Sequence, residues 1–228
     1  MTAAQRHAEA ISALRPDELV GYLAAHSGLP GQRGNIELAD AVAGTVDSFR
    51  LHEFARSPDE YLALCGAIGL GELLARGDDV LPELHALASD ERWRVREGVA
   101  RGLQRLDGEV LRPIVAAWAD DPDPLVQRAA IAAICEPRLL KDPLNAAAAL
   151  EACHRATRDA ARSRVLRQAL GYCWSVAIAG SPGPGLTAWA ALVADPDADV
   201  QWIVRENSAK ARLAKLLGSD PAVARNGD

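Results

Sequence analysis

Histidine and cysteine can bind a metal ion, and they can act together as a base and a nucleophile. The five histidines are dispersed over different segments and form no HxxxH or HExxH pair, so their spacing predicts no metal site. The cysteines form no CxxC pair and lie in apolar helical patterns, so we expect reduced core thiols at Cys65, Cys135, Cys153 and Cys173. Cys153 and His154 are adjacent, and neighbouring residues on a helix point about 100° apart, a poor geometry for a nucleophile and its base.

The segment GLPGQRGN, residues 28–35, is the other candidate for chemistry. Its glycines and Arg33 precede an expected helix N-terminus, where an anion could bind. It matches neither a P-loop nor a GxGxxG fingerprint and follows no strand, so we interpret it as a structural loop. The sequence therefore predicts no catalytic residue, no metal and no cofactor, and favours a protein that is not an enzyme.

Arginine and tryptophan are concentrated in DERWRVREGVARGLQRL, residues 90–106. These two residue types are typical of binding hot spots, and they can also grip phosphates and stack on bases. Whether they bind anything depends on the elements that carry them.

The composition points to an ordinary helical protein. Hydrophobic residues make up 49% of the 228 residues, charged residues 25% and aromatic residues 4%, while alanine and leucine are abundant. The net charge of −6 disfavours a protein that coats nucleic acid nonspecifically. No apolar run is long enough for a membrane span, and the N-terminus has no signal-peptide block, so we expect a cytoplasmic protein.

An internal repeat organises the chain. Five segments align on an apolar anchor, with spacings of 33, 31, 39 and 35 residues between Leu62, Val95, Val126, Val165 and Val200. A shorter apolar pattern precedes most of them, so each repeat is predicted to be a helix, a turn and a second helix. The four valines are expected to be buried between paired helices.

Helix start signals recur in the same places. Ser57-Pro58 followed by Glu60 predicts a capping box, with Ser57 as the N-cap. A capping aspartate followed by proline recurs at residues 121–122, 123–124, 142–143 and 195–196. Asn35 is expected to cap a helix in the N-terminal part.

The sequence predicts an all-α fold in three parts. Residues 1–56 are less regular and are expected to form an N-terminal helical cap, residues 57–217 to hold the repeats, and residues 218–228 to form a flexible tail.

The aspartate-led turns followed by xVRxxxAxxL helices resemble HEAT repeats, which belong to the armadillo-like α-solenoids, over about residues 57–217. The resemblance implies an α-solenoid of about five HEAT-like helical pairs, in which the second helix of each pair lines a concave face. HEAT-repeat proteins scaffold complexes, transport cargo, assist enzymes or bind DNA.

A helical wheel selects the residues of that face. The position two after each anchor points away from the buried stripe, and Trp174 and Trp93 fall on or near the same side. We therefore predict a concave binding face formed by Trp93, Arg94, Glu97, Arg101, Arg128, Arg167, Trp174, Trp202 and Arg205.

These residues favour a non-catalytic scaffold or adaptor that holds a protein segment. The segment is expected to offer acidic groups to the arginines. The alternative interpretation is that the arginines pair with nearby acids and that the tryptophans pack between adjacent repeats.

A weaker resemblance concerns the alkylpurine DNA glycosylases built on HEAT-like repeats. Arg167 followed by Trp202 is similar to the arginine and aromatic residue of their concave face, which implies a nucleic-acid-binding relative as the second candidate. Their carboxylate is expected one repeat before the arginine, where this chain has Arg128, and Glu97 lies two repeats before it.

Overall fold

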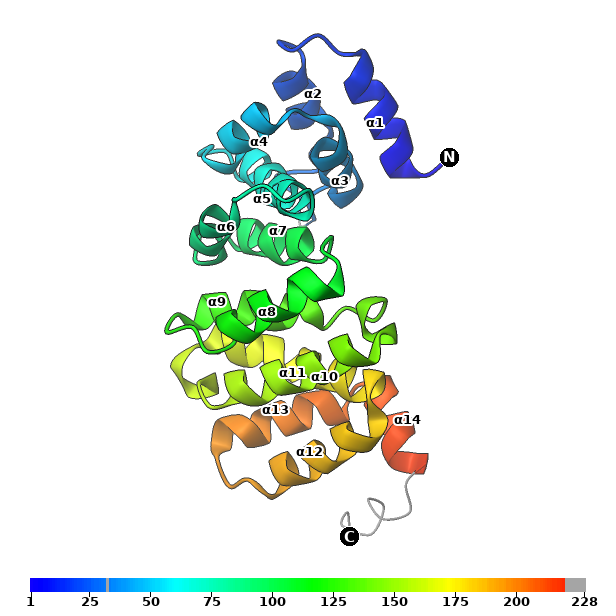
Figure 1. The fold of residues 1–228 in the computed structure, drawn as a ribbon, viewed down its shortest axis with the longest axis vertical. Coiled ribbons are helices and arrows are strands. Elements are labelled where there is room, and N and C mark those ends of the chain that lie inside the picture. Colours follow the sequence, from blue (N-terminus) through cyan, green and yellow to red (C-terminus); the bar gives the residue numbers. More distant parts are fainter. Residues whose placement is uncertain (32, 220–228) are drawn as a thin grey trace. The chain divides into compact units, whose positions relative to one another are not determined.

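The computed structural model describes residues 1–31 and 33–219, and all regular secondary structure in these residues is helical (Figure 1). The predicted all-α fold is therefore confirmed. None of the helices in this described part is long and apolar enough to cross a membrane. The chain divides into two compact units, Met1–Asp107 and Gly108–Asp228.

Unit 1 holds the first seven helices. They are α1 (Ala3–Ala13), α2 (Leu19–His26), α3 (Ile36–Thr45), α4 (Ser48–Ala55), α5 (Glu60–Ala75), α6 (Leu81–Ala88) and α7 (Trp93–Leu103). Helix α5 packs against α3, α4, α6 and α7, and α1 packs against α3. The centre of unit 1 is therefore α5, which is buried along most of its length.

Unit 2 holds the remaining described helices. They are α8 (Gly108–Trp118), α9 (Pro124–Ile134), α10 (Pro143–Thr157), α11 (Arg164–Gly180), α12 (Pro182–Ala194), α13 (Ala198–Ser208) and α14 (Ala211–Ser219), with 3₁₀ turns η1 (Leu139–Lys141) and η2 (Ala160–Arg162). Helix α11 packs against α9, α10, α12, α13 and α14, and is the centre of this unit.

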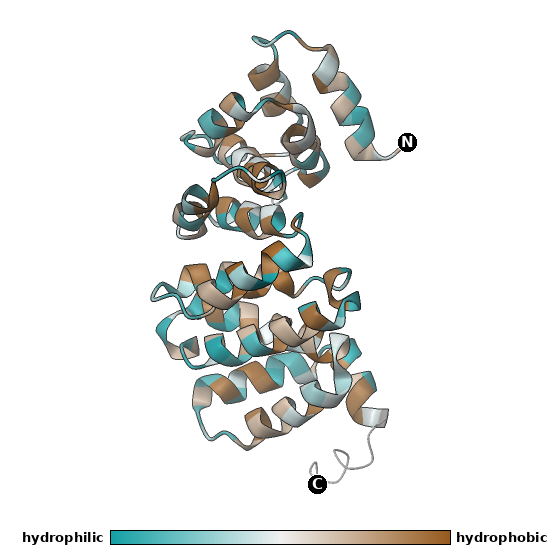
Figure 2. Cartoon of the chain, in the orientation of Figure 1, coloured by the Kyte–Doolittle hydropathy of each residue, from teal (hydrophilic) through white to brown (hydrophobic). Residues whose placement is uncertain are grey.

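The helices form five consecutive pairs, as the repeat predicts. The pairs are α4–α5, α6–α7, α8–α9, α10–α11 and α12–α13, and the two helices of each pair are in contact. Second helices of neighbouring pairs also touch within each unit, α5 with α7 in unit 1, and α9 with α11 and α11 with α13 in unit 2. Most helices carry both hydrophobic and hydrophilic stretches (Figure 2), because each buries one side against its neighbours.

The turns before four of the second helices share one hydrogen-bonding arrangement. A serine or aspartate side chain accepts from the backbone N–H two residues later, at 2.8–3.1 Å, in the turns that begin at Ser57, Asp90, Asp121 and Asp195. In the last three turns a side chain six residues later donates to the carbonyl of that aspartate, from Arg96, Gln127 and Gln201. The aspartates thus order the turn, which explains their recurrence.

Two of the four Asp-Pro pairs cap a helix as predicted. Asp123 and Asp142 accept from the backbone of α9 and α10, each with proline as the first helical residue, and Asn35 caps α3. The prediction of Ser57 as an N-cap is wrong. The cap of α5 is Asp59, which accepts from the N–H groups of Tyr61 and Leu62 at 2.9 Å, because Ser57 is used in the preceding turn.

Three of the four valine anchors are buried, namely Val95, Val126 and Val200, each the third residue of its helix. The anchor at Val165 is wrong by one residue, since Val165 is half-buried and Leu166 is fully buried. Helix α11 begins at Arg164, after η2, so its third residue is Leu166. Leu62 is also half-buried, although it is the third residue of α5.

The expected division at residues 56 and 57 falls between α4 and α5, two helices that pack on each other. The compact units divide instead after Asp107. Of the expected tail, residues 218 and 219 are the end of α14, and residues 220–228 lie outside the described residues.

Candidate binding surface

Trp93 is the most exposed tryptophan in the described part of the chain. It is the first residue of α7 and is 50% exposed, and its ring centroid lies 4.5 Å from the guanidinium carbon of Arg94. A stacked arginine of this kind gains a cation–π attraction of roughly 0.5–1 kcal/mol at exposed sites. Trp93 therefore exposes a large apolar ring to solvent at the start of α7, and the stacked Arg94 holds the ring in place.

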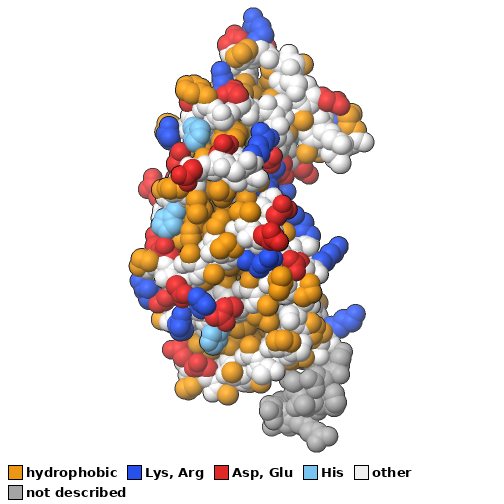
Figure 3. Space-filling model, in the orientation of Figure 1, with side chains coloured by type: hydrophobic (Ala, Val, Ile, Leu, Met, Phe, Trp, Pro, Cys, Tyr) orange, Lys and Arg blue, Asp and Glu red, His pale blue; other side chains and the backbone are white. Residues whose placement is uncertain are grey.

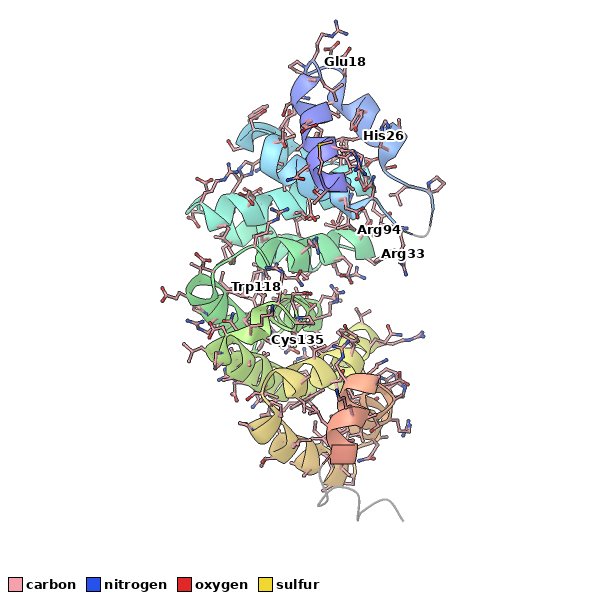
Figure 4. All side chains as sticks on the ribbon, turned by 90° about the vertical axis from the view of Figure 1, so that its right-hand side faces the viewer. Glu18, His26, Arg33, Arg94, Trp118 and Cys135 are labelled. Atoms are coloured by element: carbon pink, nitrogen blue, oxygen red, sulfur yellow. The ribbon has the colours of Figure 1, made fainter. Side chains whose placement is uncertain are left out.

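Arg94 is fixed by contacts to other parts of unit 1. Its Nη1 donates to Glu60 of α5 at 2.9 Å, and its Nη2 donates to the carbonyl oxygen of Gly31 at 3.1 Å. Only 15% of its side chain is exposed. In Figure 4 Arg94 and Arg33 lie on the same side of unit 1, near the loop that begins at Gly28. Because Arg94 holds this loop, the structural interpretation of residues 28–35 is supported.

Arg101 of α7 and Arg105, two residues after its end, tie the helix to its neighbours. Arg101 donates to both carboxylate oxygens of Asp40 in α3, at 3.2 and 2.6 Å, and Arg105 bonds Asp40 and Glu72 of α5, each at 2.9 Å. Such a network holds better than isolated surface pairs, each of which is worth about 0–1 kcal/mol. The arginines of the predicted binding face that lie on α7 are thus engaged within the chain. Glu97, on the same predicted face, is exposed.

Arg105 is not among the predicted binding residues, although it follows Arg101 by four residues and so lies on the same helix side. The acidic partners Asp40, Glu60 and Glu72 were also missed, because they lie 33 to 65 residues away in sequence. Arg92 has a similar structural role. It holds the pKa of Asp90 below its usual range by hydrogen bonding the carboxylate, and donates to the carbonyls of Ser57 and Pro58.

A cleft of about 460 Å³ opens beside Arg94. Its lining comes from α2, the following loop and the start of α5: Val20, Ala24, Ser27, Leu29, Pro30, Asp59, Glu60, Tyr61 and Leu62, together with Arg94. Val20 is 44% exposed at this cleft. Arg94 therefore lines the cleft and also stacks with the Trp93 ring, so that the cleft and the ring lie next to each other in unit 1.

In unit 2 the predicted row is divided between surface and packing. Arg167 forms an ion pair with Asp199 and stacks over Trp202, with its guanidinium carbon 5.3 Å from the ring centroid. The Trp202 ring packs on Gly171 of α11, where an added Cβ would lie 2.8 Å from it. Trp202 is half-buried by these contacts, which fits the alternative interpretation of packing between repeats.

The prediction that Trp174 belongs to an open face is wrong. Its side chain is fully buried, and its Nε1 donates to Oγ1 of Thr157 at 3.0 Å. The wheel assumed one covered side for each helix, whereas α11 has neighbours on several sides. Trp118 and Trp189 are also buried in unit 2.

The one-residue shift in α11 also changes the composition of the row. Glu97, Arg128 and Trp202 are each the fifth residue of their helix, and the fifth residue of α11 is Gln168 rather than Arg167. Arg128 is half-buried, and Arg205 is exposed on α13. The structure thus brings Arg167 into contact with Trp202, and Trp93 into contact with Arg94. Within neither unit do the predicted residues form one continuous row.

The cysteines are buried as the sequence predicts, whereas two of the histidines, His7 and His26, come together with ring centroids 6.5 Å apart. All four cysteines are buried and free, and burial raises the pKa of the Cys65 thiol. Cys153 is buried whereas His154 is exposed, so the two side chains face different surroundings. The residues that the structure describes contain no group of three or more histidine, cysteine or acidic side chains able to hold a metal ion.

The fold and the turns define a helical-repeat protein, and the comparison with known families names the repeat. Residues 49–135 match the family described as HEAT repeats, in agreement with the predicted HEAT-like helical pairs. A solved crystal structure of an engineered protein, from the Northeast Structural Genomics Consortium, aligns at 15% identity over 92% of this chain and 100% of that chain, with a TM-score of 0.37. No curated protein matches the chain. The weaker resemblance to DNA glycosylases finds no support in these comparisons.

Proposed function

We propose that this chain is a non-catalytic HEAT-repeat scaffold that binds a protein segment on unit 1, at Trp93 and the adjacent cleft. HEAT repeats suit protein interaction, because stacked helical pairs offer extended surfaces. The observation that carries the proposal is the 50% exposed ring of Trp93, stacked on an Arg94 that also lines the cleft.

The fixed arginine is an advantage for such a site. Binding costs free energy when a mobile side chain must be ordered, about 0.5–1.5 kcal/mol for each one. Arg94 is already held by Glu60 and by the carbonyl of Gly31. The partner therefore meets a preorganised tryptophan and arginine beside an apolar cleft wall, the combination that dominates many interfaces.

The charges of unit 1 favour an apolar segment here. Unit 1 contains 11 arginine and 17 acidic residues, a net charge of −6, and unit 2 contains 14 basic and 14 acidic residues. Arg94 and Arg101 are neutralised by Glu60 and Asp40. An acidic segment or a phosphate backbone would have to displace these carboxylates, so a segment that seats an apolar side chain against Trp93 fits better.

Site-specific photo-crosslinking tests this proposal. A photoreactive phenylalanine analogue is placed at position 93, and, as a control, at Phe49, which is 71% exposed on α4 of the same unit. After irradiation in cells, we expect discrete protein adducts at position 93 that are absent at position 49 and persist after nuclease treatment. Adducts equal at the two positions, or adducts removed by nuclease, would contradict a protein-binding site at Trp93.

A further inference from the structure

A second cleft lies in unit 2, and the charges of its lining differ from those of the cleft in unit 1. It has a volume of about 390 Å³ and is lined by Pro137, Leu140, Lys141, Val176, Ala179, Gly180 and Arg212. These residues come from the segment around η1, the last turns of α11 and the start of α14. Leu140 and Val176 form a buried apolar floor, while Ala179 and Lys141 are exposed.

Tyr172 lies on α11 one turn before Val176, which lines the cleft. Residues 172, 176 and 179 are spaced by four and three positions, so their side chains lie on one side of the helix. Tyr172 is 44% exposed, and its hydroxyl accepts from Nη2 of Arg212 at 3.0 Å. The guanidinium carbon of Arg212 lies 4.8 Å from the ring centroid. An exposed aromatic ring therefore extends the apolar floor, with Arg212 beside it.

The cations of this cleft differ from the arginines of α7. Arg212 is held by an aromatic ring and a hydroxyl, and this contact orients its charge without cancelling it. Lys141 supplies a second positive charge at the rim, and none of the described residues that line the cleft is acidic. The cleft therefore combines an apolar floor with two cations and no acidic residue in its described lining, whereas Arg94 meets Glu60 in the cleft of unit 1.

From this arrangement we infer that the cleft between η1, α11 and α14 binds a partner segment in which an apolar side chain stands next to carboxylates. The apolar side chain lies on Leu140 and Val176, and the carboxylates pair with Lys141 and Arg212, where charge-assisted hydrogen bonds form. The volume is near the lower end of the roughly 300–1,000 Å³ of ligand pockets, which suits a side chain and its neighbours rather than a large cofactor. The site is separate from Trp93, so either proposal can fail alone.

Short fluorescein-labelled peptides test the inference with the full chain. One probe carries a leucine flanked by aspartates, a second has lysines in place of the aspartates, and a third has glycine in place of the leucine. Fluorescence anisotropy should show binding of the first probe, and at least about tenfold weaker binding of the other two, because each lacks one half of the recognition.

Three variants locate the binding on the protein. Arg212→Glu reverses a charge of the cleft, Ala179→Trp fills the cleft without changing charge, and Arg164→Glu is the control with the same charge change at an exposed position at the start of α11, outside the cleft lining. We expect the first two to weaken binding of the leucine–aspartate probe by about tenfold or more, and the control to leave it unchanged. Thermal melts of all three identify any variant that fails to fold, and a folded Ala179→Trp or Arg212→Glu suffices to decide.

Four results would overturn the inference. They are equal affinity for the lysine probe, equal affinity for the glycine probe, equal loss in Arg164→Glu and Arg212→Glu, and displacement of the probe by a single-stranded oligonucleotide with a steep dependence on salt. The last result would assign the cleft to nucleic acid. Tighter binding of a peptide with the sequence of residues 220–228 would replace the partner with this chain's own C-terminal segment.

Discussion

Replacing Gly71 with alanine is expected to disturb the contact between α5 and α7 that positions the arginines of unit 1. An alanine Cβ at this position would lie 2.3 Å from both Cα and the carbonyl carbon of Gly102 on α7. Carbon atoms in contact are normally about 3.5–4.0 Å apart, so the two helices would have to separate. Both obstructing atoms belong to the backbone, and no side-chain rotation can relieve the overlap.

The magnitude follows from two opposing effects. Overpacking of a closely packed contact costs about 1–3 kcal/mol, and the rigid backbone on both sides places Gly71→Ala at the upper end. Alanine is favoured over glycine in a helix by about 1 kcal/mol, which offsets part of the loss. We therefore expect the free energy of unfolding to fall by about 2 kcal/mol, and the melting temperature by about 4–8 °C for a chain of this size.

Circular dichroism melts of Gly71→Ala and of a matched control measure this effect. The control is Gly21→Ala at an exposed position of α2, where an added Cβ meets no atom within 4 Å. Here only the helix preference changes, so the control should gain up to about 1 kcal/mol. A melting temperature of Gly71→Ala at or above that of the unchanged chain would refute the close approach of α5 and α7, and with it the positioning of Arg94 and Arg101.

Three further predictions concern the interior and the turns. Asn207→Ala should lower the free energy of unfolding by about 2–4 kcal/mol in urea titrations, because the buried amide accepts from the Ser175 N–H at 2.8 Å and donates to the Leu170 carbonyl at 2.9 Å; a loss below about 1 kcal/mol would contradict it. The hydrogen bond from Arg92 lowers the pKa of Asp90, so this pair stabilises the fold above the ordinary pKa of the carboxyl, and the stabilisation is lost as the pH falls below about 4. Asp90→Asn should therefore be less stable than the unchanged chain at pH 7 and should lose less stability on acidification, and an equal loss in the two proteins would argue against the pairing. The four buried thiols should react with a thiol reagent at pH 8 far more slowly in the folded chain than in urea, and equal rates would show that they are accessible.

The repeat could be predicted from the sequence because its signals are local. The aspartate turn and the valine that follows recur at fixed distances, and both are fixed by hydrogen bonds within about ten residues of the chain, as at Asp121 and Val126. The register failed where the turn itself differed. The turn before α11 contains η2, which places Leu166 where the spacing predicts Val165.

The binding surface was less predictable because a helical wheel specifies directions and not neighbours. It places Arg94 away from the buried stripe, but nothing in the local sequence reveals Glu60, 34 residues earlier, as its partner. The same limitation explains Trp174, which faces other helices of unit 2. Arg212 and Lys141 were missed because the repeat pattern assigns no role to η1 or to α14.

The most direct test of the central claim is the affinity of Trp93→Ala for the partner captured at position 93, measured together with its melting temperature. We expect the free energy of binding to weaken by about 2 kcal/mol or more, roughly thirtyfold in affinity, because truncation of a hot-spot aromatic residue costs this much. The melting temperature should change little, since half of the Trp93 side chain is already exposed. Unchanged affinity, or a loss of stability with binding intact, would contradict the claim that Trp93 is a binding residue of this scaffold.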